Sequence, residues 1–149
     1  MIVKKPKFLS VKSVPKLFWS SPKALTISPP PISVLFLVIG LVLFGLGEAL
    51  LVASGAGVSP WTVLAQGLSQ VTSWSIGYST FIISLIVLFC WIPLKQIPGI
   101  GTILNAIIIA LVFEYILPIL PTFKNPLLQI AEATLGVLVT GFGGALYLI

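Results

Sequence analysis

Long apolar runs separated by short polar breaks dominate the chain from residue 32 onward. Each run is about 20 residues long, and a helix of that length, rising about 1.5 Å per residue, crosses a hydrocarbon core of about 30 Å. Proline, glycine or lysine stands at the boundaries, as at Pro93, Lys95 and Pro121. The pattern predicts an all-α, polytopic transmembrane helix bundle with four spans: 32–53, 76–94, 100–120 and 127–149.

The connection between the first two runs, residues 54–75, contains no charged side chain. Ser59 and Pro60 are residue types preferred at the N-cap and the first position of a helix, and apolar residues recur at helical spacing from Trp61 onward. An amphipathic helix over 60–71 is therefore expected. It lies either along the membrane interface, with Trp61 as an anchor, or re-entrant within the protein. The absence of lysine from its polar face favours the re-entrant position.

Charge divides the chain into two parts. It has eight basic and three acidic residues, and six of the lysines precede residue 24. We interpret residues 1–31 as a basic cytoplasmic tail that fixes the topology or attracts anionic lipid headgroups. With this tail inside a bacterial inner membrane, Lys95 is also inside and Lys124 is outside, so four spans return the C-terminus to the cytoplasm.

Composition excludes most catalytic chemistry. The sequence contains no His, Asp or Arg, and its single cysteine, Cys90, lies inside an apolar run. A metal cage, a disulfide framework and a Ser/His/Asp triad therefore lack the residues they need. We expect no enzyme, no cofactor and no metal. The mean hydropathy of +1.18 indicates the lipid bilayer as the main partner, and basicity confined to the tail argues against nucleic acid.

The first and last apolar runs share the pattern G-x4-G-x-G-x-A-L. A repeat unit with an odd number of spans inserts its second copy upside down, so the pattern predicts an inverted-repeat half plus one helix, as in secondary transporters. Small residues that merely pack two unrelated helices are the alternative. On the repeat interpretation the chain is a fragment or works as a homo-oligomer of incomplete units. The paired glycines are Gly40, Gly45 and Gly47 in the first run and Gly136, Gly141 and Gly143 in the last.

Three sequence runs resemble a known family. They are GLGEALLVASGAGVSPWTVLAQGLS (45–69), SIGYSTF (75–81) and PGIGTILNAIIIA (98–110). Their G-x-S-P-W and P-G-x-G-T-x-x-N motifs are similar to those in the first half of the YczE/YyaS/YitT family of bacterial integral membrane proteins, over about residues 34–149. Members of that family are usually longer and carry a second G-x-G-P-R-D-G-like segment and a second G-x-G-T segment, which are absent from this sequence. The resemblance implies a membrane protein without a defined activity.

Three glutamates, Glu48, Glu114 and Glu132, fall inside the predicted spans. An ionisable group inside a span costs about 2.5 kcal/mol or more and is a functional candidate by default. Under the predicted topology all three lie at a similar depth near the outer side, so we expect one polar cluster that binds a proton or a cation. The alternative is that Glu48 and Glu132 reach water or headgroups, which leaves only Glu114 buried.

Other polar features add to these carboxylates. A helix that starts at Ser59 and Pro60 has free backbone amides that suit an anionic or polar ligand group, or it has a plain cap. Asn105 is an amide inside a span that either joins helices or contacts a ligand. The candidate path for a solute or proton consists of Glu48, Ser59, Pro60, Trp61, Asn105 and Glu114.

Two classes of function are compatible with this sequence. One is a transporter or permease for an unidentified small solute, coupled to protons through Glu48 and Glu114. The other is an accessory or regulatory membrane component that transports nothing, with a truncated, non-functional fragment as a variant of that class.

Overall fold

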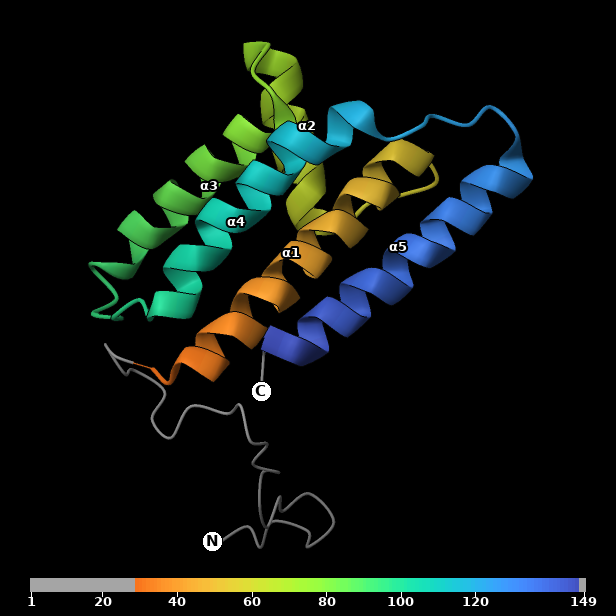
Figure 1. Cartoon of the computed structure of the whole chain (residues 1–149). Helices are drawn as coiled ribbons and strands as arrows, with labels where there is room; N and C mark the ends of the chain where they lie inside the picture. Colours follow the sequence, from red (N-terminus) through yellow and green to blue (C-terminus); the bar gives the residue numbers. More distant parts are fainter. Residues whose placement is uncertain (1–28, 148–149) are drawn as a thin grey trace, which may run out of the picture.

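The computed structural model describes residues 29–147 as a helical bundle, and this part of the chain contains no strand (Figure 1). In lipid, backbone N–H and C=O groups must be satisfied within their own segment, so long apolar runs form helices. The predicted all-α class is confirmed, and the predicted basic tail lies, up to residue 28, outside the described residues. The elements are α1 (Pro31–Ser54), α2 (Pro60–Thr72), α3 (Ile76–Trp91), α4 (Ile100–Ile116), the 3₁₀ helix η2 (Leu117–Ile119) and α5 (Pro126–Tyr147).

Three helical segments are long and apolar enough to cross a membrane: Pro31–Ser54, Ile100–Ile119 and Pro126–Tyr147. α2 and α3 qualify only together, and they are bent by 113° at the break between them, the geometry of a broken span or a re-entrant loop. α3 ends at Trp91, before the predicted end of the second span at residue 94, because Pro93 lacks the N–H that would continue the helix. The described residues thus contain three candidate spans, or four if the bent pair is one.

The neighbouring helices α1 and α4 are parallel, and each packs against an antiparallel partner, α5 beside α1 and α3 beside α4. α1 and α4 run one way, whereas α3 and α5 run the other way (Figure 1). At one end of the bundle α1 begins, α3 connects to α4 and α5 finishes; at the other end lie the α2–α3 connection and the start of α5. The apolar core lies between α1 and α4, where Ala49, Ile109 and Phe113 are buried against one another.

α1 and α5 pack along four glycines, Gly40, Gly47, Gly136 and Gly143, which we call the glycine seam. A Cβ added at Gly40 would lie 2.9 Å from the carbonyl oxygen of Gly143, and one at Gly143 would lie 2.7 Å from that of Gly40. Gly47 and Gly136 are related in the same reciprocal way. A Cβ added at Gly47 would lie 2.6 Å from the carbonyl oxygen of Gly136, and one at Gly136 would lie 2.9 Å from that of Gly47. Backbone fills the space at each position, so only glycine permits the two helices to approach this closely.

Gly45 and Gly141 hold equivalent positions in the predicted repeat but have different surroundings. A Cβ added at Gly45 would lie 3.1 Å from the Cβ of Val112 on α4. A Cβ added at Gly141 would meet no atom of the described chain within 4 Å. α4 therefore covers α1, and the corresponding face of α5 is uncovered within residues 29–147.

Candidate functional site

Glu48, Ser59 and Thr62 form a hydrogen-bonded group, which we call the Glu48 site. Glu48 lies on α1, six residues before the helix ends at Ser54, and is 5% exposed. Its Oε2 accepts hydrogen bonds from Ser59 Oγ and Thr62 Oγ1, each 2.7 Å long. Ser59 also caps α2, because the backbone N–H of Thr62 donates to its Oγ at 3.4 Å. One buried carboxylate therefore holds the N-terminus of α2 beside α1.

A glycine turn returns the chain to the level of Glu48. Gly55 follows α1 with a φ of 67°, and Gly57 has a φ of 157°. Both conformations favour glycine, because a side chain at these angles meets the neighbouring backbone. The two glycines reverse the chain direction so that Ser59 lies against Glu48 rather than beyond the end of α1.

The helix predicted over 60–71 is present as α2, and its small and polar side faces the bundle. Thr62 is 1% exposed and Ala65 is fully buried, whereas Leu64 and Val71 on the apolar face are 55% and 86% exposed. An interfacial helix turns its polar side to water and its apolar side to lipid or protein. A polar side fixed to a buried carboxylate instead favours the re-entrant position.

A cavity of about 360 Å³ lies beside the Glu48 site. It is formed by side chains of α1 to α5, with α1 and α2 supplying Glu48 and the Ser59 cap, and α4 supplying Asn105. Most of the predicted path residues come together here, although they are far apart in the sequence. Those that line the cavity are Glu48, Ser59, Pro60, Trp61 and Asn105.

Two hydroxyl groups of α3, on Thr80 and Ser84, also line this cavity and were not among the predicted residues. They stand four residues apart, which places them on one helix face, and this spacing in an apolar run is the signal that identifies them. Ser84 Oγ donates to the backbone oxygen of Thr80 at 2.8 Å. Thr80 Oγ1 is buried without a hydrogen-bond partner among the described residues. Thr80 therefore has a buried hydroxyl group whose hydrogen-bonding capacity the described residues leave unused.

A second cavity, of about 640 Å³, lies between the Glu48 site and α5. Glu48 and Ser59 line both cavities, and neither cavity is lined by a lysine of the described part of the chain. Thr140 of α5 lines the second cavity, and its Oγ1 is buried without a partner in residues 29–147. The hydrogen bond between Glu48 and Ser59 thus lies where two partly polar cavities meet.

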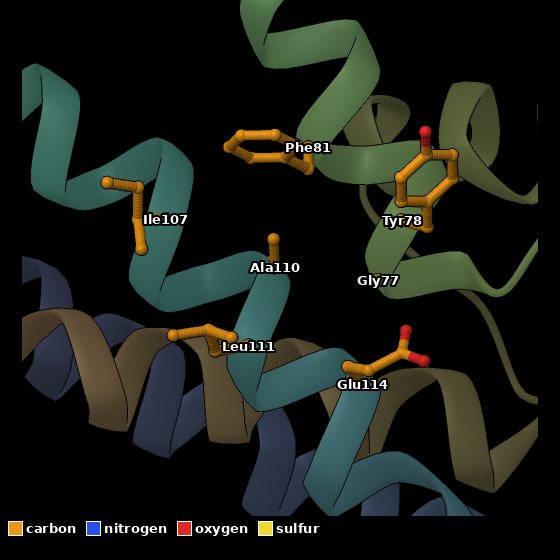
Figure 2. Close-up of a pocket in the computed structure, with 7 residues that line it drawn as sticks. All are labelled: Gly77, Tyr78, Phe81, Ile107, Ala110, Leu111 and Glu114. Atoms are coloured by element: carbon orange, nitrogen blue, oxygen red, sulfur yellow. The ribbon is translucent and has the colours of Figure 1, made fainter.

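Glu114 does not join the Glu48 site, so the prediction of one carboxylate cluster is wrong. Glu114 is exposed, accepts a hydrogen bond from Ser75 Oγ and lines a groove between α3 and α4 (Figure 2). It follows the buried Phe113, and a rotation of about 100° per residue turns it from the α1 side of α4 toward α3. Depth along a span sets the height of a side chain but not its direction around the helix.

Glu132 does not share the hydrogen bonds of the Glu48 site. It is 7% exposed, and both of its carboxylate oxygens are buried without a hydrogen-bond partner in the described part of the chain. The alternative prediction, in which only Glu114 is buried, is therefore wrong as well: α1 and α5 bury Glu48 and Glu132 where they pack together, and Glu114 is exposed. Residues 29–147 contain no group of three His, Cys, Asp or Glu side chains that can hold a metal ion.

Comparison with known proteins places this site in a family. Residues 32–149 match the model of a family described as "Family of unknown function (DUF6198)". The chain belongs to the DUF6198 family. The match contains the whole Glu48 site, the glycine seam and the groove at Glu114.

Two curated relatives of the DUF6198 chain are longer than it is. An uncharacterized protein of Haemophilus influenzae is 38% identical over 138 residues, which cover 93% of this chain and 62% of the relative. The uncharacterized membrane protein YczE of Bacillus subtilis is 33% identical over 113 residues, which cover 72% of this chain and 51% of the relative. The resemblance to YczE is confirmed, and the chain is a membrane protein of unknown function. No solved structure matches it.

Proposed function

We propose that this DUF6198 protein carries a small polar solute across the bacterial cell membrane, with Glu48 as the group that binds the solute or a proton. The observation that carries the proposal is a buried carboxylate located where two cavities meet, bonded to the start of α2. Ionisable groups inside membrane proteins are costly and mark ion and substrate paths.

The occupancy of Glu48 controls how firmly α2 is held. As a carboxylate, it accepts hydrogen bonds from Ser59 and Thr62, and such charge-assisted bonds are stronger than neutral ones. A proton or a cationic group of the solute neutralises this charge and weakens both bonds. The N-terminus of α2 then moves away from α1 and connects the two cavities. Binding at one carboxylate is thereby coupled to the movement of one short helix.

The glycine seam supports an inverted repeat as part of this proposal. Gly40 contacts Gly143 and Gly47 contacts Gly136, while the repeat pattern equates Gly40 with Gly136 and Gly47 with Gly143. Exchange of the two helices therefore converts one contact into the other, which is the property of a two-fold, self-complementary interface. In this proposal α5 is the first helix of a second unit inserted in the opposite orientation.

The orientation belongs to the same proposal. Lys95 lies in the α3–α4 connection, at the end of the bundle where α1 begins, and Lys124 lies in the connection at the other end (Figure 1). With six lysines before residue 24, the positive-inside rule assigns the first end to the cytoplasm of a bacterial inner membrane. The Glu48 site, in the last two turns of α1, then lies nearer the outer face.

Proton flux in proteoliposomes tests the proposal. The purified protein is reconstituted with pyranine inside the vesicles, and single amino acids, sugars and small amines are added outside one at a time. We expect at least one solute to cause proton entry with the wild-type protein. Glu48→Gln is expected to abolish that flux, because the amide preserves the shape of the side chain but neither ionises nor carries a proton.

Glu132→Gln is the matched control for this experiment. It makes the same chemical change on a buried carboxylate of α5 that lines neither cavity, so we expect it to retain the flux. Equal loss of flux in both variants would remove any special role for Glu48. If no solute causes flux with the folded wild-type protein, the proposal of proton-coupled transport through Glu48 fails and an accessory role becomes the better explanation.

A further inference from the structure

The groove at Glu114 is a feature that the proposed transport function does not use. It lies between α3 and α4, has a volume of about 510 Å³, and we call it the α3–α4 groove. Glu114 and Tyr78 line one end of it, and Phe81 and Ile107 line the other (Figure 2). Tyr78, Ile107 and Leu111 are exposed, so the groove opens on the outside of the bundle, where lipid surrounds a membrane protein.

Small residues create the space for this groove. A Cβ added at Gly77 of α3 would lie 2.6 Å from the backbone oxygen of Ala110 on α4. The two helices therefore touch through Gly77 and Ala110, and the groove lies beside that contact. The larger apolar side chains, Phe81, Ile107 and Leu111, line the groove and leave it open.

The groove has one charged end and one apolar end. Glu114 lies two residues before α4 ends at Ile116, and its only hydrogen-bond partner in residues 29–147 is Ser75, the N-cap of α3. Ile107 is seven residues earlier on α4, which corresponds to about 10 Å along the helix. The carboxylate therefore lies within about two turns of the end of the apolar segment Ile100–Ile119, on its headgroup side, and the apolar walls extend from it toward the middle of the bundle.

We propose that the α3–α4 groove binds a membrane phospholipid with a primary ammonium headgroup, of the phosphatidylethanolamine type. The ammonium group donates hydrogen bonds to Glu114, which is the only charged side chain of residues 29–147 that lines the groove, and an acyl chain lies along Phe81, Ile107 and Leu111. A carboxylate at the end of an apolar groove attracts a cationic group, and a charge-assisted hydrogen bond is stronger than a neutral one. Tyr78 adds an aromatic ring at the headgroup end, which favours a cation further.

Native mass spectrometry with defined lipids tests this site. The protein is purified in a mild detergent and incubated with dioleoyl-phosphatidylethanolamine, dioleoyl-phosphatidylglycerol or dodecylammonium. We expect phosphatidylethanolamine to be retained about tenfold more tightly than phosphatidylglycerol, which is the effect of about one charge-assisted hydrogen bond. Dodecylammonium presents the same amine on one short chain, and it should be retained less than the phospholipid.

Three variants separate recognition from folding. Glu114→Gln should lose the preference for phosphatidylethanolamine, and Ile107→Trp, which fills the groove but leaves the carboxylate, should lower retention of all lipids. Glu132→Gln, on α5, should retain the preference. Equal retention of the two phospholipids by the wild-type protein, or an unchanged preference in folded Glu114→Gln, would overturn the proposal. Tighter retention of dodecylammonium than of phosphatidylethanolamine would also overturn it, in favour of a site for free amines.

Discussion

α1 is held on two of its sides by opposite means. Toward α5, the glycine seam packs backbone against backbone. A Cβ added to any of its four glycines would lie less than 3 Å from a carbonyl oxygen of the other helix. Toward α2, the Glu48 site joins the helices through rotatable side chains and hydrogen bonds of 2.7 Å. An added atom in the seam meets backbone, which cannot rotate away, whereas each contact of the Glu48 site can break and reform. The same helix thus carries a rigid interface on one side and a switchable contact on the other.

The largest effect is expected from an added methyl group in the seam. In Gly47→Ala, the new Cβ would lie 2.5 Å from the backbone nitrogen of Thr140 and 2.6 Å from the oxygen of Gly136, so α1 and α5 must separate. Overpacking of this kind costs about 3 kcal/mol at the upper end of its range. Thermal unfolding in detergent should show a strongly lowered Tm or loss of the monodisperse protein.

Gly141→Ala makes the same change on the uncovered face of α5. Nothing of the described chain lies within 4 Å of the new methyl group, and alanine in a helix interior is more stable than glycine by about 0.5–1 kcal/mol. The Tm should therefore rise slightly. A lowered Tm for Gly141→Ala, comparable to that of Gly47→Ala, would mean that the seam is not distinct from the rest of α5.

A smaller and local effect is expected at the Glu48 site. Thr62→Val keeps the size of the side chain but removes the hydroxyl group that donates to Glu48. A hydrogen bond to a charged group contributes about 1.5–3 kcal/mol. Amide hydrogen exchange should become faster in the first turns of α2, with little change in α1 and α5, because the glycine seam does not depend on this bond.

Thr62→Ser tests whether the hydroxyl group is the cause. Serine retains the donor, so α2 should keep most of its protection from hydrogen exchange. If Thr62→Val loosens α1 and α5 as much as α2, the Glu48 site is part of the rigid frame, and the contrast between the two sides of α1 disappears.

The smallest effect on stability is expected from Glu114→Gln. Glu114 is exposed and its hydrogen-bond partner, Ser75, can also donate to an amide oxygen. Exposed substitutions of this type usually change stability by less than about 0.5 kcal/mol. The same Tm measurement should therefore place this variant next to the wild type. A loss as large as that of Thr62→Val would show that the two carboxylates are equally important for the fold.

Local chemistry made several elements predictable from the sequence. Apolar length alone predicts α1, α4 and α5, because lipid leaves a backbone no other partner than its own helix. The Ser59 and Pro60 pair predicts the start of α2, because both residue types match the geometry of a helix N-terminus. These features depend on neighbours within a few residues, so no tertiary information is needed.

Rotation of the helices was the part that the sequence could not supply. Glu48 and Glu114 have similar depths in their spans, but Glu48 turns toward α2 and Glu114 toward the α3–α4 groove. Thr80 and Ser84 were missed for the same reason, since a hydroxyl group in a span gains a role only from what faces it. The periodicity of apolar residues does not reveal which side of a span faces protein, because all sides of a buried or lipid-facing helix are apolar.

The sequence by itself therefore determined the membrane class, the helices and the resemblance to the YczE-like family, all of which depend on composition and on residues close together in the chain. Only the tertiary structure decided that Glu48 meets Ser59 and Thr62, that Glu114 is separate, and that the glycines of α1 and α5 contact one another reciprocally. Hydropathy specifies the position of a residue along the membrane normal, whereas contacts depend on how the helices rotate and pack. Close packing at glycines and a few hydrogen bonds between polar side chains determine that rotation.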